Sequence, residues 1–208
     1  MASDGSTVYN GALSTDVMEN GTGLYGNSSS TQSGVFVPRP GHPNQYYVIT
    51  GTATENPPSD GLNYSIIDMG ENSGKGKVLE KNKPLEFGGA RIETDGTGAL
   101  IDRLKAYEGI AVYPHADGVN YWMVNRTRDK FFTWLIDGNG IGPSPVSVTQ
   151  ANEDGGGLYQ DVTTAGNYAG IMMSKFSMDG TLLANSFTYA YRDIPGNIRT
   201  YPNTYLIV

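Results

Sequence analysis

Two histidines, His42 and His115, and no cysteine are available for chemistry in this chain of 208 residues. Thiol catalysis, disulfides and zinc sites with cysteine ligands are therefore excluded. A zinc site built from several histidines is excluded as well, and a site of two histidines and one carboxylate would need both. His42 stands in a Pro-Gly-His-Pro run and His115 just precedes a turn. We expect each to be an ordinary turn or surface residue.

The 21 acidic residues make some close carboxylate pairs unavoidable, and such pairs carry out glycoside cleavage. No spacing selects one pair, and no Gly-x-Ser-x-Gly nucleophile elbow occurs. Residues 73–77 lack the spacing and the final hydroxyl of a phosphate loop. Residues 95–98 and 137–140 resemble calcium loops only faintly, because they lack alternating ligands and a late glutamate. The sequence therefore predicts tight turns there, with no catalytic residue, no metal and no cofactor.

Aromatic and guanidinium side chains are the most plentiful binding chemistry. The chain has 14 Tyr, 6 Phe and 2 Trp, and arginine and aromatic residues are enriched at interface hot spots. Most of these aromatics are expected in the core, because alternate residues of a strand face opposite ways. The candidate binding residues surround one expected hairpin and its turn, whose tip we expect to be exposed: Tyr121, Trp134, Arg126, Arg128 and Asp129.

Composition narrows the class of protein. Fourteen basic residues against 21 acidic ones give a net charge of −7, which disfavours partners that carry phosphate, namely nucleic acid and anionic membrane surfaces. No apolar run approaches the roughly 20 residues of a membrane-spanning helix. The first residues have neither the basic nor the apolar region of a signal peptide. The chain is thus either cytosolic or a piece cut from a larger precursor, and we favour the second.

Short β-branched and aromatic runs separated by turns recur along the chain. Three Asp-Gly pairs, at 117–118, 137–138 and 179–180, stand between such runs, and this pair is a strong hairpin signal because a tight turn needs positive φ. The runs fall into groups of about four. The expected strands are 35–37, 45–50, 62–69 and 77–82, then 110–113, 121–125, 130–136 and 145–149, and last 170–177 and 181–187.

This grouping predicts an all-β fold of β-propeller blades, each made of four antiparallel strands. Within a single domain, 1–208, the blades are expected at about 35–85, 108–150 and 168–208, after an N-terminal remnant, 1–34. A β-sandwich is the alternative, because it also spaces its strands at 8–12 residues. Since a closed ring needs about 4–8 blades, we expect a fragment of a larger propeller or an arc completed by a partner chain.

Five stretches carry a family resemblance: 3–10, 18–33, 64–69, 76–82 and 175–184. The most specific is Asn-Gly-Thr-Gly-Leu followed by Gly-Asn-Ser-Ser-Ser-Thr-Gln-Ser within 20–33, whereas Phe-Ser-x-Asp-Gly is shared by many propellers. Together they resemble the WD40-like β-propeller region of large secreted Bacteroidetes proteins. Many of those proteins carry a gliding-motility-associated or type IX secretion sorting domain at the C-terminus. This chain departs from their pattern after Ser186, and we expect it to be a piece of such a protein without the signal peptide and the sorting domain.

The resemblance implies a non-enzymatic module at the cell surface or outside the cell, which binds protein or glycan or serves as a structural scaffold. It supplies no catalytic residues to carry over. The expected partners are other protein chains or further blades of the same polypeptide, and glycans. The alternatives are a glycan-active enzyme on the same fold and a phage or viral surface protein that uses the same module.

Overall fold

The computed structural model is an all-β structure with almost no helix. It describes residues 5–9, 16–51, 53, 61–87, 90–91, 106, 108–126, 130–142, 144–150, 172–192 and 198–207. Within these residues the one helical turn, α1 (Glu71–Gly74), has left-handed backbone angles at Asn72 and Ser73. It is therefore a tight connection between strands, and no helix in the described ranges is long and apolar enough to cross a membrane.

The first sheet contains an antiparallel meander of four consecutive strands, β3 to β6, with β1 and β2 added beyond β6. β2 joins β6 in parallel through Glu19 and Lys77, whose side chains form an ion pair at 2.8 Å. The strands are β1 (Thr7–Tyr9), β2 (Val17–Thr22), β3 (Gly34–Pro38), β4 (Gln45–Gly51), β5 (Leu62–Asp68) and β6 (Lys77–Pro84).

The second and third sheets follow in chain order. The second has the order β12-β11-β10-β9, with β13 also paired to β11, and the third has the order β14-β15-β16. A short hairpin of β7 and β8 lies between the first two sheets in the sequence. The strands are β7 (Glu86–Phe87), β8 (Ala90–Arg91), β9 (Ile110–Pro114), β10 (Tyr121–Arg126), β11 (Lys130–Asp137), β12 (Gly140–Ile141), β13 (Ser147–Gln150), β14 (Met172–Phe176), β15 (Leu183–Arg192) and β16 (Ile198–Ile207).

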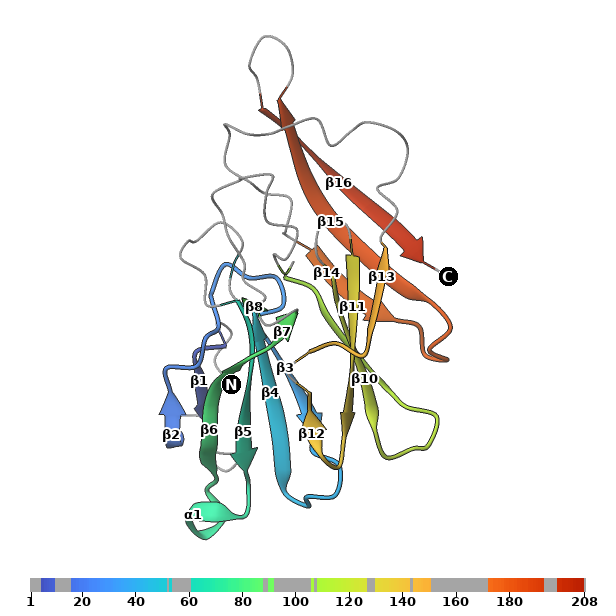
Figure 1. Ribbon diagram of the computed structural model, residues 1–208. Coiled ribbons are helices and arrows are strands. Elements are labelled where there is room, and N and C mark those ends of the chain that lie inside the picture. Colours follow the sequence, from blue (N-terminus) through green and yellow to red (C-terminus); the bar gives the residue numbers. More distant parts are fainter. Residues whose placement is uncertain are drawn as a thin grey trace.

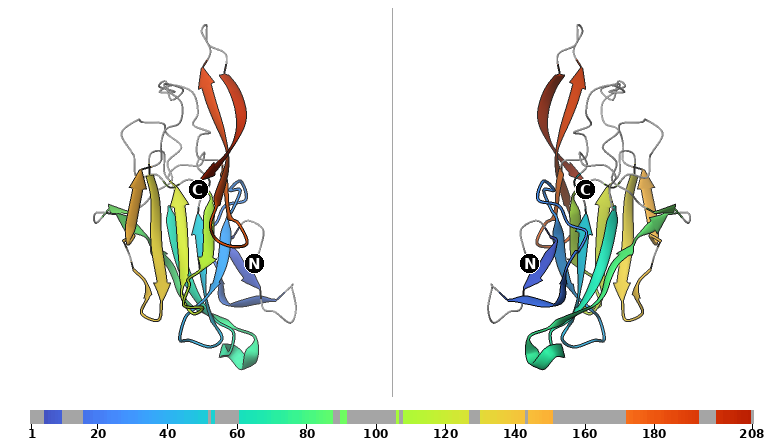
Figure 2. Two further views of the ribbon diagram at one scale, coloured as in Figure 1. Left: turned by 90° about the vertical axis from the view of Figure 1, so that its right-hand side faces the viewer. Right: turned by 90° about the vertical axis from the view of Figure 1, so that its left-hand side faces the viewer.

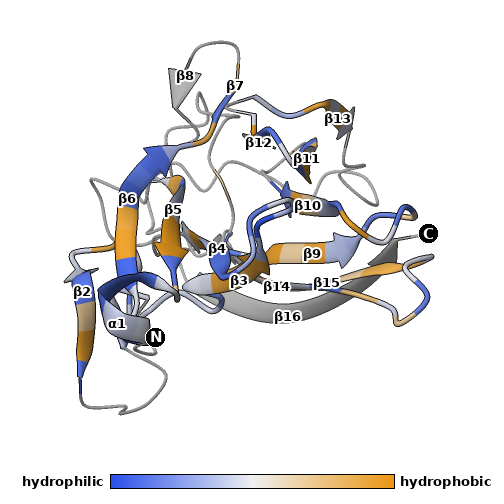
Figure 3. Ribbon diagram, turned by 90° about the horizontal axis from the view of Figure 1, so that it is seen from below, coloured by the Kyte–Doolittle hydropathy of each residue, from blue (hydrophilic) through white to orange (hydrophobic). Residues whose placement is uncertain are grey.

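The first two sheets share one hydrophobic core. Seen along the strands in Figure 3, β6 to β3 form one row and β9 to β11 a second row, and the whole curls into a half-barrel. The first sheet contributes Tyr47, Ile49 and Leu62, and the second contributes Phe132 and Trp134, all of them fully buried. Each strand places alternate residues in this core, as the pleat requires.

The opposite faces of these sheets are covered as well. On the first sheet, Val48, Ile67 and Val78 form a second cluster with Met18 and Leu24 from the N-terminal segment. β4 is consequently buried on both faces. Figure 2 shows the N-terminal strands beside the first sheet and the long β15–β16 hairpin extending past the end of the other two.

On the second sheet, the face turned away from the shared core is also largely covered. Ala111 and Val124 are paired across β9 and β10 on that face, with 3% and 9% of their surface exposed. Tyr113, on the same face, packs against Phe176 of β14 with ring centroids 5.4 Å apart. The third sheet therefore lies against this side of the second.

The all-β class predicted from the sequence is confirmed, and the expected strands of 35–82 and 110–149 are present as antiparallel meanders. Residues 189–192, where the sequence departs from the family pattern, continue β15. The curled arrangement is compatible with a sandwich as well as with blades.

Candidate binding surface

Two of the candidate binding residues face the shared core. Trp134 on β11 is fully buried, 6.0 Å from Phe132 between ring centroids, and Tyr121 on β10 packs against the same cluster while half-buried. A ligand at the surface cannot touch Trp134, so its ring acts as a core residue. In the described part of the chain the buried indole N–H of Trp134 has no hydrogen-bond partner.

Arg126 ends β10 with only 5% of its surface exposed, instead of standing at an exposed turn tip. Its guanidinium lies over the Phe131 ring, 5.3 Å from the centroid, which is a favourable cation–π distance. The other two candidates, Arg128 and Asp129, lie outside the described residues. The structure thus brings Arg126 to Phe131 and buries Trp134, so these two candidates do not share an exposed surface.

The aromatic side chains that face away from the shared core belong to other residues than the predicted ones. Trp122, which follows Tyr121 in β10, is the main example. Trp122 pairs with Tyr113 on one side and Leu135 on the other, so its side chain points away from the core that receives Trp134. His115 packs against Trp122 with ring centroids 5.1 Å apart. The signal that could have found them is the alternation in β11, where Phe132, Trp134 and Ile136 share one face.

Three hairpin turns lie at one end of their sheets, the lower end in Figure 1: those of β3–β4, β9–β10 and β14–β15. We call these three turns together, residues 39–44, 115–120 and 177–182, the hairpin face; the last two are neighbours, because Tyr113 at the end of β9 contacts Met178 and Gly180. Both histidines of the chain lie on it. It also carries two of the most exposed apolar side chains, Val119 with 58% and Met178 with essentially all of its surface exposed.

The carboxylates of this face are held by their own turns. Asp117 accepts hydrogen bonds from the backbone N–H groups of Val119 and Asn120 at 2.8 and 2.9 Å, which lower its pKa to about 2. Asp179 accepts from the Ser177 hydroxyl and from Thr181, which lower its pKa to about 2 as well. Both stay ionised at neutral pH, so they stabilise turns and cannot act as general acids there.

The β14–β15 hairpin is docked on β9. The Tyr113 hydroxyl donates a hydrogen bond to the Met178 carbonyl at 2.8 Å. Gly180, with φ of +71°, lies so close to the Tyr113 ring that a Cβ there would be 2.3 Å from it. Glycine is therefore required twice, once for the left-handed backbone and once for the contact.

The β3–β4 turn is built from two consecutive β-turns that share His42. The His42 N–H donates to the Arg39 carbonyl at 3.2 Å, and the Gln45 N–H donates to the His42 carbonyl at 3.1 Å. Each turn has proline at its second position, and its third residue has positive φ, Gly41 at +74° and Asn44 at +71°. This is the pattern of type II turns.

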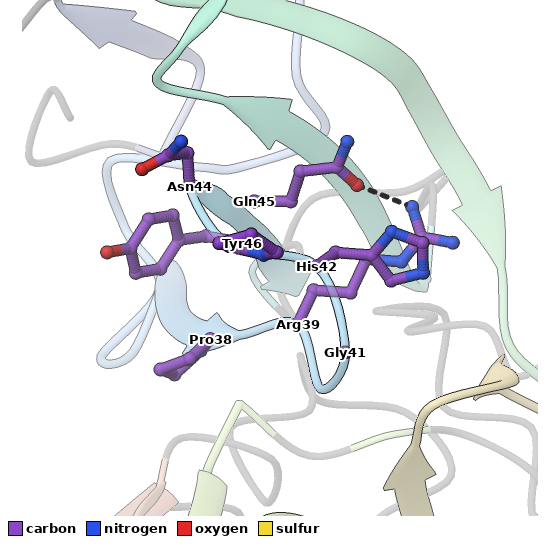
Figure 4. A pocket seen from close by; sticks show the side chains of 8 residues that line it. Pro38, Arg39, Gly41, His42, Asn44, Gln45 and Tyr46 are labelled. Carbon is purple, nitrogen blue, oxygen red and sulfur yellow. Dashed lines mark hydrogen bonds between the residues drawn. The ribbon is translucent and has the colours of Figure 1, made fainter.

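A shallow depression of about 440 Å³ surrounds this tandem turn, lined by residues 38–39 and 41–46. Figure 4 shows Arg39 and His42 extending to one side of the turn, and Tyr46 with Pro38 on the other. The Arg39 guanidinium donates to the Gln45 amide oxygen at 2.7 Å and lies 5.7 Å from the centroid of the Tyr47 ring. Burial is the main cause that raises the pKa of Tyr47, and the nearby Arg39 charge opposes it.

No group of three or more potential metal ligands occurs within the part of the chain that the structure describes. The 137–140 segment, considered above as a calcium loop, forms the β11–β12 hairpin, in which Asp137 accepts from the Asn139 N–H at 2.8 Å. Residues 95–98 lie outside the described ranges. Comparison with known proteins adds no relative: no family model, no curated protein and no solved structure matches this chain.

Proposed function

We propose that this chain is a non-enzymatic β-propeller module of an extracellular or cell-surface bacterial assembly, which binds protein or glycan or holds other components in place. The support begins with chain order. Each of the three main sheets contains a meander of consecutive strands, from β3, β9 and β14 onward. Blades are built in this sequential way.

The main support for the proposal is that the first strands of the three meanders, β3, β9 and β14, lie next to one another in turn. β9 lies beside β14 and also contacts β3, so the first strand of each meander approaches that of the next. Inner strands of successive blades meet around the axis of a propeller. The side chain of Gln32, just before β3, joins this junction with hydrogen bonds to both Ile110 and Ser174.

Burial of sheets on both faces also favours blades over a two-layer sandwich. A sandwich sheet has one face in the core and the other toward solvent, whereas β4 is covered on both faces. Ala111 and Val124 on the outer side of the second sheet are also little exposed, so this sheet too is covered on both faces, as a blade would be.

The hairpin face is the surface that this module offers to partners. Two of its turns fix their carboxylates internally and leave Val119 and Met178 exposed, and the half-buried Arg39 lines the depression at the third turn. The extracellular location is supported by the sequence resemblance to secreted propeller regions, especially the run within 20–33. The proposed partners are protein chains, further blades of the same polypeptide, and glycans.

A glycan array combined with a hydrolysis screen tests the proposal. We expect retention of protein or glycan ligands without turnover, and loss of retention when hairpin-face side chains are replaced. Turnover that disappears on a single Asp or Glu substitution would instead establish the glycan-active enzyme. A high-resolution structure of a longer chain, in which the three meanders stack as two layers rather than fan around an axis, would overturn the fold on which the function rests.

A further inference from the structure

We propose that the tandem turn of residues 39–45 is a binding site for a carboxylate, presented as a uronic acid residue of a glycan. This inference rests on the proposed glycan-binding function and assigns it to one place on the hairpin face.

Arg39 and His42 are held in place by the backbone. Each directly precedes a proline, which restricts its backbone to extended conformations, and the two residues are the first and fourth positions of one β-turn. Their Cα atoms therefore lie within about 7 Å. Gly41 between them places no side chain in the way and has no atoms near its Cβ direction. Such preorganisation reduces the entropy lost when a ligand binds.

The orientation of the guanidinium is fixed by a chain of hydrogen bonds. Asp68 accepts from the Gln45 amide nitrogen at 2.8 Å, which lowers the pKa of that carboxyl. The Gln45 amide oxygen is thereby turned toward Arg39, whose Nη1 donates to it at 2.7 Å. The Tyr47 ring supports the guanidinium from one side.

Arg39 keeps donors that nothing in the described part of the chain accepts. No carboxylate in the described ranges is paired with it, and its Nε is buried without a hydrogen-bond partner. A guanidinium offers five N–H donors and no acceptor. One Nη group of Arg39 donates to the neutral Gln45 amide, and Arg39 also hydrogen-bonds the Tyr47 side chain. The buried Nε is out of reach of a ligand, so the remaining Nη N–H groups of this oriented cation are the donors for an anionic oxygen, and the adjacent His42 imidazole supplies another donor.

The size and lining of the depression favour a sugar over a protein face. Its volume of about 440 Å³ lies within the roughly 300–1,000 Å³ typical of small-ligand sites. Pro38 and Tyr46, on the other side of the turn from Arg39 and His42, supply apolar faces that a neighbouring sugar ring of the same glycan can cover. A uronic acid residue beside Arg39 and His42 therefore matches the charge, and a further residue of the same glycan reaches the apolar side of the turn.

Calorimetric titration of the 208-residue chain with tri-galacturonate tests the site, and the methyl-esterified trimer is the matched ligand, because it keeps the sugar rings and replaces each carboxylate by a neutral methyl ester. We expect binding of the acid that weakens with added salt, and at least ~tenfold weaker binding of the ester. Inorganic phosphate and a hexa-glutamate peptide form the two further arms, and each is expected to bind more weakly than the sugar acid. Equal or tighter binding of the ester, the phosphate or the peptide would overturn the uronate assignment.

Variants locate the binding. Arg39→Met is expected to abolish binding of the sugar acid. Arg39→Lys is expected to weaken binding about tenfold, because lysine keeps the positive charge but cannot donate two parallel hydrogen bonds to a carboxylate. His42→Gln should weaken it severalfold, whereas His115→Gln, the same change in the neighbouring hairpin, should leave it unchanged. If Arg39→Met fails to fold, the lysine and His42 variants decide the outcome.

The result separates this site from the broader function. If Arg39→Lys and His42→Gln bind the sugar acid with wild-type affinity, the proposed uronate site is wrong. If the same variants still bind other glycans or proteins, the proposed function is unaffected. Absence of any glycan or protein ligand for the wild-type chain removes both.

Discussion

Gly180 illustrates how a single residue can serve two constraints at once. Its φ of +71° and the Tyr113 ring 2.3 Å from its Cβ direction act together. Gly118 in the neighbouring turn has almost the same φ, +73°, with nothing within 4 Å. The two glycines occupy equivalent Asp-Gly turns that the sequence identifies equally well, and they differ only in what lies next to them.

Gly180→Ala should lower the free energy of unfolding by about 3 kcal/mol, because the left-handed backbone costs about 1–2 kcal/mol and the ring contact adds overpacking. Gly118→Ala should cost only the backbone part, about 1 kcal/mol. Urea unfolding of the two variants measures both. Equal losses would show that the β14–β15 hairpin is not packed on Tyr113.

Asp179 makes stability depend on pH. Its folded-state pKa of about 2 lies below the ordinary value of 3.8, and the Ser177 hydroxyl is the largest cause. A lowered folded-state pKa means that the stabilisation is complete above about pH 5 and is lost as the pH falls toward 2. The slope of unfolding free energy between pH 5 and 2 should therefore decrease in Asp179→Asn.

Ser177→Ala is the companion variant, because it removes the hydroxyl donor and keeps the carboxylate. The pKa of Asp179, followed by NMR titration of its carboxyl carbon, should rise toward its ordinary value in this variant. An unchanged pKa would mean that the Thr181 donors alone hold the carboxylate ionised.

At the scale of elements, Gln32 links strands that do not pair with each other. Its amide oxygen accepts from the Ile110 and Ser174 N–H groups at 3.1 and 2.8 Å. Its amide nitrogen donates to the carbonyls of the same two residues at 3.3 and 3.4 Å. One side chain therefore satisfies backbone groups of both β9 and β14, in the way that a residue of an intervening strand would.

Glu108 adds to the same junction. Its fully buried carboxylate accepts from the Thr31 N–H at 2.8 Å and from the Thr31 hydroxyl. The segment before β3 is thus attached to the entrance of β9 at two successive residues.

Gln32→Ala should lower the free energy of unfolding by about 3 kcal/mol, since it leaves buried backbone groups without partners. Hydrogen exchange at the Ile110 and Ser174 amides should accelerate more than elsewhere. Asn27→Ala is the control, because within the described ranges the Asn27 side chain accepts only from Ser29 in its own exposed loop, and it should change neither amide. Protection of both amides in Gln32→Ala would show that the junction does not depend on this side chain.

At the scale of the whole molecule, a sheet that is covered on both faces indicates more than two packed layers. Val124 lies on the outer face of the second sheet with 9% of its surface exposed, so a substitution there tests whether that face is covered. Val119, at the tip of the adjacent hairpin, is 58% exposed.

Val124→Asp should cost about 3 kcal/mol or more, because it places a charge in a covered interface. Val119→Asp should change stability by no more than about 0.5 kcal/mol, as a surface substitution does. Thermal and urea unfolding of the pair provide the comparison. A tolerated Val124→Asp would mean that this face is open to solvent.

Much of the fold could be predicted from local signals. The alternating residues of 130–136 and the Asp-Gly pairs indicate strands and hairpins, and the structure contains them. The candidate site could be predicted far less well. Trp134 and Trp122 are both aromatic strand residues, and only the pairing of β10 with β11 shows that they face opposite sides.

The amino-acid sequence by itself determined the all-β class, the order of the strands and the positions of the turns, because periodicity and turn chemistry act over a few residues. Tertiary structure decided which faces are buried, how Gln32 joins β9 to β14, and that Arg39 has no carboxylate partner in the described part of the chain. These features depend on contacts between residues up to 142 positions apart. No local pattern encodes them, because each depends on how separate sheets come together.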